Sequence, residues 1–173
     1  MDISKVAIGK EPPKDINVII EVPMHVPIKY ELDKDSGAVF VDRFIATPMT
    51  YPCNYGFIPG TLSDDGDPAD ALVLGQFALT PGSVIRARPV GVLMMEDEAG
   101  KDEKLICVPH AKMTPLYSDL VDVNDIPASL RDQIQHFFEH YKDLEKGKWV
   151  KVTGWESCAK AESLIEEAIK RVS

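Results

Sequence analysis

The chain has 173 residues, of which 45% are hydrophobic and 27% charged, and a formal net charge of −9 at pH 7. This composition is typical of one globular domain, expected to span residues 1–173, and it excludes the disordered and fibrous classes of protein. The acidity also argues against a nucleic-acid partner, because the average surface would repel backbone phosphates.

The cysteines and the N-terminal residues indicate in which cellular compartment the protein is expected. Cys53, Cys107 and Cys158 are scattered and form no CxxC pair, which favours reduced thiols and a cytoplasmic protein. The N-terminal MDISKVAIGKEPPKD lacks the apolar core of a signal peptide, and no stretch approaches the ~20 apolar residues that cross a bilayer. We therefore expect neither secretion nor membrane insertion.

The first half of the chain predicts short β-strands. Between Asn17 and Gly91, runs such as NVIIEVP, AVFVDRF, YGFIPG and DALVLGQF lie between turn residues. In KYELD, Tyr30 and Leu32 alternate with charged residues, which is the pattern of a half-buried strand. The turn residues of LDKDSGAVFVDRF predict a hairpin. Repeated strand and turn signals favour a barrel or a sandwich.

The last third predicts two amphipathic helices, at 128–144 and 158–172. Their apolar residues recur at helical spacing: Leu130, Ile134, Phe137, Phe138 and Tyr141 in the first, and Ala161, Leu164, Ile165, Ala168 and Ile169 in the second. Between them KWVKVTGW predicts a strand, with Trp149 and Trp155 as packing anchors. The predicted fold class is mainly β with flanking helices (α+β).

The stretch SDDGDPADALVL, residues 63–74, is the densest cluster of acids: it holds Asp64, Asp65, Asp67 and Asp70. On a straight strand Asp70 points away from Asp65 and Asp67, so convergence requires the bend that glycine and proline can provide. Two carboxylates about 4 Å apart repel by roughly 4 kcal/mol at an effective dielectric near 20. Such a cluster binds hard cations such as Mg²⁺, or it is an acidic surface loop or a calcium-stabilised turn.

A second acidic run, EDEAGKDEK, is by itself typical of a solvated hairpin tip. If Asp97 and Asp102 fold toward Asp65 and Asp70, the site holds more than one metal ion, which suits in-line phosphoryl displacement. Cations and tyrosines elsewhere in the chain could bind phosphate oxygens: Lys29, Arg43, Lys104 and Lys142, together with Tyr55 and Tyr141.

Ordered segments over most of the chain resemble one known family. They are PIKYELDKDSGAVFVDRF, YPCNYGFIPGTLSDDGDPADAL, PGSVIRARPVGVLMMEDEAGKDEKL, DVNDIP and HFFEHYKDLEKGKWVKV. With DGDPAD as the signature, the chain resembles the soluble, metal-dependent inorganic pyrophosphatases of the bacterial type. The resemblance implies an OB-like five-stranded β-barrel with helices packed outside, hydrolysis of pyrophosphate to two orthophosphates by a multi-metal site with a metal-activated water as nucleophile, and a homohexamer.

The resemblance also implies a role for each residue at a matching position. Mg²⁺ ions would be bound by Asp65, Asp70 and Asp102, with Asp97 helping to hold an additional ion, and Asp67 would act as general base. Phosphate oxygens would be contacted by Lys29, Arg43, Tyr55, Lys104, Tyr141 and Lys142, and the cavity would be lined by Glu21 and Glu31. One position departs from the signature: Ala69 stands where a larger aliphatic residue is usual, so we expect looser packing beneath the loop.

Other interpretations stay open. HFFEH, residues 136–140, matches the H-x-x-E-H motif of zinc proteases, although His25 and His110 offer no obvious third ligand. Alternatively His136, His140 and Asp143 face another subunit, because bacterial members of the family resembled are hexamers. An OB-type oligonucleotide-binding module is disfavoured by the absence of a basic stripe with interleaved aromatics. A calcium-binding structural domain is the remaining option.

Overall fold

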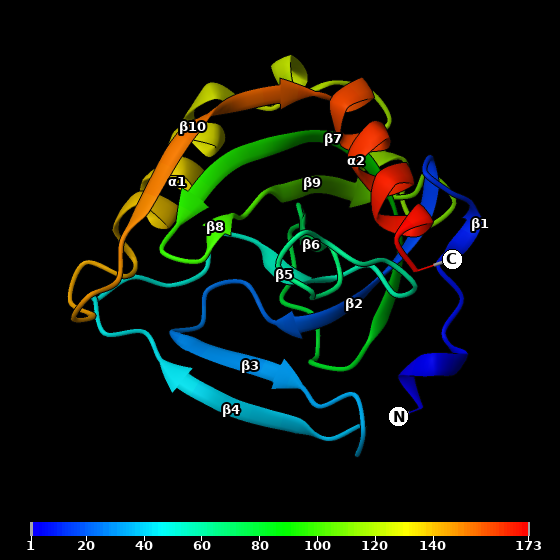
Figure 1. Ribbon diagram of the computed structural model, residues 1–173. Coiled ribbons are helices and arrows are strands. Elements are labelled where there is room, and N and C mark those ends of the chain that lie inside the picture. The colour runs from blue at the N-terminus through cyan, green and yellow to red at the C-terminus, as the bar shows by residue number, and fades with distance from the viewer. Residues whose placement is uncertain (1, 173) are drawn as a thin grey trace.

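The computed structural model describes residues 2–172 and is mainly β (Figure 1). Met1 and Ser173, the two ends of the predicted domain 1–173, lie outside the described residues. The strands are β1 (Gly9–Glu11), β2 (Asp15–Val22), β3 (Ile28–Leu32), β4 (Val39–Phe44), β5 (Asn54–Phe57), β6 (Asp70–Val73), β7 (Val84–Asp97), β8 (Gly100–Lys101), β9 (Lys104–Pro109) and β10 (Val150–Ser157). The helices are α1 (Ala128–His140) and α2 (Cys158–Lys170), with short 3₁₀ turns at Ile3–Lys5, Pro115–Tyr117 and Val123–Asp125.

Within the described residues, β3 and β4 form a separate two-stranded sheet, and the other strands form an eight-stranded sheet that curves into a ring. Its order is β1-β2-β5-β6-β9-β7-β10, with β8 paired to β7. An additional pairing of β2 with β7 joins β2, β5, β6, β9 and β7 into a closed path, because the long β7 contacts β2 near its start and β10 near its end. Figure 1 shows the resulting barrel-like arrangement with the helices outside it. The mainly β class and the barrel expected from the sequence are confirmed.

The central strands are buried on both faces, and each face packs against a different helix. Alternate residues of a strand point to opposite sides. Leu72 and Ile106 accordingly join the cluster beneath α1, whereas Ala71 and Cys107 join the cluster beneath α2. Strand β9 pairs in parallel with β6 and antiparallel with β7, and every one of its residues is buried. The barrel wall is therefore held from both sides.

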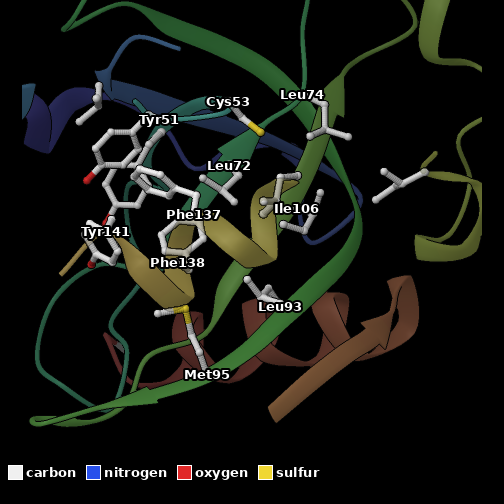
Figure 2. Close-up of a cluster of buried hydrophobic side chains, with 14 of the residues drawn as sticks. Tyr51, Cys53, Leu72, Leu74, Leu93, Met95, Ile106, Phe137, Phe138 and Tyr141 are labelled. Atoms are coloured by element: carbon white, nitrogen blue, oxygen red, sulfur yellow. The ribbon is translucent and has the colours of Figure 1, made fainter. Parts of the chain in front are cut away.

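The cluster beneath α1 also positions aromatic side chains of the candidate site. Phe137 stacks on Tyr141 with ring centroids 5.0 Å apart and contacts Tyr51 at 4.8 Å. Figure 2 shows Tyr51 and Tyr141 at one edge of this cluster, with their hydroxyl oxygens pointing away from it. The packing of α1 thus holds two phenol groups at the border of the core.

Helix α2 lies against the other side of the sheet. Ser157 caps its first turn by accepting a hydrogen bond from the backbone N–H of Lys160 at 3.3 Å. Ala161, Ile165 and Ala168 are buried against the barrel, as the predicted spacing required, while Leu164 is only partly buried. None of the helices within residues 2–172 is long and apolar enough to cross a bilayer.

Some boundaries differ from the sequence prediction. Helix α1 ends at His140 instead of 144, because the chain turns there and directs Tyr141 and Lys142 into the interior, where they are 6% and 7% exposed. Trp149 is 48% exposed and is not a packing anchor. It precedes β10 and lies outside the sheet, whereas Trp155 packs against the core and donates to Gln135 Oε1 at 3.0 Å.

Candidate active site

A cavity of about 1000 Å³ lies between the barrel, the β3–β4 hairpin and the turn that follows α1. Every side chain that the sequence analysis assigned to the site lines this cavity: Glu21, Lys29, Glu31, Arg43, Tyr55, Asp65, Asp67, Asp70, Asp97, Asp102, Lys104, Tyr141 and Lys142. These residues come from segments spread over most of the chain. The fold therefore collects the predicted carboxylates and cations around one space.

Residues 63–69, hereafter the signature loop, make the bend that the sequence required. Gly66 has a φ of +93°, a conformation that side-chain-bearing residues rarely adopt. The Asp65 carboxylate accepts the backbone N–H of Asp67 at 3.0 Å, which closes a local turn. Asp67 lines the cavity with its side chain 75% exposed and forms an ion pair with Lys34 at 3.1 Å. Asp70 begins β6 directly after the loop.

Lys104 joins two of the predicted metal ligands. Its ammonium lies 2.5 Å from Asp70 Oδ2 and 2.5 Å from Asp102 Oδ1, and the residue is only 4% exposed. Burial alone would lower the pKa of Lys104, but the two carboxylates outweigh burial and raise it. The lysine is therefore charged, and Asp70 and Asp102 converge on one point although 32 positions separate them in sequence.

A second buried ion pair closes the far end of the site. Lys142 Nζ lies 2.8 Å from Asp97 Oδ2, and both side chains are largely buried. Burial would raise the pKa of Asp97, but the hydrogen bond from Lys142 lowers it below its usual range. The pair links the end of β7 to the turn after α1, so the packing of α1 controls where Lys142 points.

The hairpin of β3 and β4 supplies further charges. Lys29 faces Arg43 across the hairpin, and its ammonium contacts Glu31 at 2.7 Å and Asp42 at 3.4 Å. Arg43 Nη1 lies 3.6 Å from Glu145 Oε2. Within the described residues, the buried Nε of Arg43 has no hydrogen-bond acceptor. An unsatisfied guanidinium donor at a cavity wall is suited to an anionic ligand.

Among the carboxyl groups that line the cavity, Glu21 has the pKa that is shifted furthest from its ordinary value. Burial raises its pKa to about 7, although its Oε1 accepts the backbone N–H of Leu32 at 2.8 Å. The nearby charge of Asp70 acts in the same direction. In the absence of metal ions this side chain is therefore divided between its neutral and charged forms near pH 7.

Sequence reasoning missed several residues that line the cavity. Tyr51 is 2% exposed and its ring lies 5.6 Å from that of Tyr55. Asp42 and Lys34 form ion pairs with Lys29 and Asp67 respectively. The four-residue spacing of the tyrosines in YPCNY and the DR pair in VFVDRF were the available signals, but neither identifies a cavity without the tertiary contacts.

The family of the chain follows from comparison with known proteins. A family model described as inorganic pyrophosphatase matches residues 18–173. The chain belongs to the inorganic pyrophosphatase family. It is 62% identical to the inorganic pyrophosphatase of Gluconobacter oxydans over 169 residues, covering 98% of both chains. It is 59% identical to that of Escherichia coli over 172 residues, covering 99% of this chain and 98% of the relative.

Solved structures of the family have the same fold. The inorganic pyrophosphatase of Thermus thermophilus superposes with a TM-score of 0.95 at 43% identity, covering 99% of each chain. That of Helicobacter pylori gives a TM-score of 0.94 at 50% identity, covering 97% of this chain and 98% of the other. The resemblance stated from the sequence is confirmed, and with it a hydrolase of the pyrophosphatase family.

The family is metal-dependent, and the donor set of the cavity suits hard divalent ions. Its acidic lining offers carboxylate oxygens and no histidine or cysteine, which favours magnesium or calcium over zinc. In residues 2–172, no three side chains of aspartate, glutamate, histidine or cysteine lie close enough together in this conformation to hold a metal ion. Asp70, Asp97 and Asp102 are instead paired with lysines. A divalent cation would replace the lysine ammonium groups as the partner of these carboxylates, so the residues present fit such an ion.

The H-x-x-E-H motif forms no comparable site. The rings of His136 and His140 lie 4.5 Å apart, and His140 Nδ1 is 2.8 Å from Asp143 Oδ2. Glu139 accepts a hydrogen bond from Gln135 at 2.9 Å. The two histidines lie on the exposed side of α1, Asp143 lies in the turn after it, and none of them lines the cavity, which removes the structural support for a zinc-protease interpretation.

Proposed function

We propose that the chain hydrolyses inorganic pyrophosphate to two orthophosphates in this cavity. Asp65, Asp70, Asp97 and Asp102 would hold the Mg²⁺ ions. The observation that supports this proposal is that carboxylates, which can bind metal ions, and buried cationic side chains, which can bind phosphate, line the same cavity. Bound metal ions would neutralise phosphate oxygens and generate a hydroxide nucleophile near neutral pH.

The side chains of the protein would transfer the proton and bind the substrate. Asp67 accepts the proton of the attacking water, because its exposed carboxylate reaches into the cavity from the tip of the signature loop. Arg43 and Lys29 bind phosphate oxygens from the hairpin, and Lys142 binds them from the opposite side. Lys104, Tyr55 and Tyr141 complete the contacts to the substrate, while Glu21 and Glu31 line the cavity.

A phosphate-release assay tests the proposal directly. The purified chain is given pyrophosphate, ATP or a peptide, each with Mg²⁺, Zn²⁺, Ca²⁺ or EDTA. We expect phosphate release from pyrophosphate with Mg²⁺ and its loss in EDTA. Metal binding without turnover would contradict the enzyme assignment and favour a calcium-binding structural domain.

Asp70→Ala is expected to raise the Mg²⁺ concentration that gives half-maximal activity by about tenfold or more, because one charged oxygen ligand is lost. The magnesium dependence of phosphate release measures this. Asp64→Ala is the matched control, since Asp64 lies in the same loop but forms an exposed ion pair with Arg171 outside the cavity. An unchanged magnesium requirement in Asp70→Ala would refute the ligand assignment.

We also propose a cytoplasmic homohexamer. The exposed polar group formed by His136 and His140 on α1 and Asp143 in the turn after it provides a surface for contacts between subunits. Cys53, Cys107 and Cys158 form no disulfide in the described residues, which is consistent with a reducing compartment. Sedimentation velocity is expected to give six times the chain mass of 19.2 kDa, and a monomer at micromolar concentration would contradict the hexamer.

A further inference from the structure

The two ends of the signature loop meet at one buried hydroxyl group. Thr61, just before the loop, is 5% exposed. Its Oγ1 donates a hydrogen bond to the backbone oxygen of Ile58 at 2.6 Å and accepts one from the backbone N–H of Ala69 at 2.9 Å. The N–H of Ile58 in turn donates to the oxygen of Ala69 at 2.9 Å. Thr61 therefore joins the chain entering the loop to the chain leaving it.

This junction determines where β6 and its first residue begin. Ala69 directly precedes Asp70, and Asp70 pairs with Phe57 across β5 and β6. Thr61 Oγ1 binds the N–H of Ala69 and the N–H of Ile58 binds the carbonyl oxygen of Ala69, so the two bonds together orient Ala69 and hence the direction in which the Asp70 side chain leaves the backbone. The position of Asp70 relative to Asp65 and Asp67 thus depends on a group that does not line the cavity.

Other contacts of the loop are weaker anchors. Arg171 contacts Asp64 at 2.8 Å, but the two side chains are 36% and 57% exposed, and such a surface pair contributes little. Hydrogen bonds within the loop, from Ser63 N–H to Asp67 O at 2.7 Å and from Gly66 N–H to Ser63 O at 3.1 Å, shape its tip. Neither of them connects the tip to the barrel. That connection is made by the buried hydroxyl of Thr61 together with the backbone hydrogen bond from the Ile58 N–H to the Ala69 oxygen at 2.9 Å.

We propose that Thr61 is a positioning residue for metal binding: its hydroxyl holds the signature loop in the conformation that lets Asp70 act together with Asp65. The inference rests on the proposed function, since it assumes that these carboxylates bind the metal. It assigns Thr61 no contact with substrate or metal. Loss of the hydroxyl leaves all the carboxylates of the loop in place, but we predict that it lowers their affinity for divalent ions.

Thr61→Val removes the hydroxyl with almost no change in volume, and Thr61→Ser retains it. Mn²⁺ or Mg²⁺ binding is measured by calorimetry without substrate, on full-length protein. We expect Thr61→Val to bind the ion about fivefold to tenfold more weakly, which corresponds to the loss of one or two hydrogen bonds. Thr61→Ser should bind within about twofold of the original chain. Thr153→Val is the control, since Thr153 on β10 donates an exposed hydrogen bond to the backbone oxygen of Met94 on β7 and makes no hydrogen bond to the signature loop among the described residues.

Hydrogen exchange of the metal-free protein gives a second readout that does not depend on the proposed function. Peptides covering residues 63–70 should exchange faster in Thr61→Val and at the original rate in Thr61→Ser. If Thr61→Val does not fold, Thr61→Ala, which leaves room for a bridging water, is measured in the same way.

The outcomes separate the two proposals. If Asp70→Ala binds metal as tightly as the original chain, the ligand assignment fails whatever Thr61 does. If Asp70→Ala weakens binding but Thr61→Val leaves both metal affinity and exchange unchanged, the positioning role of Thr61 is overturned. Equal weakening in Thr61→Val and Thr61→Ser would also overturn it, because the hydroxyl would then not be responsible.

Discussion

Asp67→Asn is expected to lower turnover of pyrophosphate by about 10² to 10⁴ while the fold and metal affinity remain. The amide has the shape of the carboxylate but cannot accept the proton of an attacking water. The Asp67 side chain is 75% exposed, and the ion pair that it forms with Lys34 is also exposed to solvent. The substitution therefore disturbs neither packing nor a strong contact. The loss should therefore appear in kcat, with little change in protein stability.

The measurement is phosphate release at saturating Mg²⁺, together with calorimetric metal binding. Asp64→Asn is the matched control, because it makes the same chemical change three positions away, outside the cavity. We expect this control to retain activity within about twofold. Turnover near that of the original chain in Asp67→Asn would show that another group accepts the proton.

Lys104→Met is expected to lower the free energy of unfolding of the metal-free protein by about 3 kcal/mol, since removing one partner of a buried ion pair leaves uncompensated charge. In the original chain this ammonium separates Asp70 and Asp102, at 2.5 Å from each. Methionine fills a similar volume without charge, so the two carboxylates would repel each other. Turnover should fall as well, because the contact to phosphate that we propose for Lys104 is lost.

Urea unfolding in EDTA and in saturating Mg²⁺ tests this expectation. The deficit of Lys104→Met should be largest in EDTA and smaller with Mg²⁺, because a bound cation restores positive charge beside the same carboxylates. Lys101→Met is the control, since Lys101 is exposed and forms no ion pair in the described part of the chain. Equal stability of both variants in EDTA would contradict the role of Lys104.

Local features of the sequence predicted local structure well. Alternating residues in KYELD and the turn at Asp35 predicted the hairpin of β3 and β4. The helical spacing of Ala161, Ile165 and Ala168 predicted the buried side of α2. In each case the signal depends on neighbouring residues alone, because periodicity records which side of an element is buried.

Elements that depend on distant partners were not predicted. Strand β9 has no alternation, because it is buried on both sides between β6 and β7. The end of α1 was placed beyond His140, since nothing in the local sequence shows that Tyr141 and Lys142 turn into a cavity. The packing beneath the signature loop stays a prediction: Ala69 is 5% exposed and contacts the core cluster of α2.

The sequence by itself determined the family, the chemistry of the candidate residues and the bend of the signature loop, since motif order and residue type are local information. Only the tertiary structure decided that Lys104 lies between Asp70 and Asp102, that Asp97 pairs with Lys142, and that Thr61 binds the N–H of Ala69. The physical reason is that periodicity shows that a side chain is buried but not against which partner. The partner is chosen by the closure of the barrel and the packing of α1 on it.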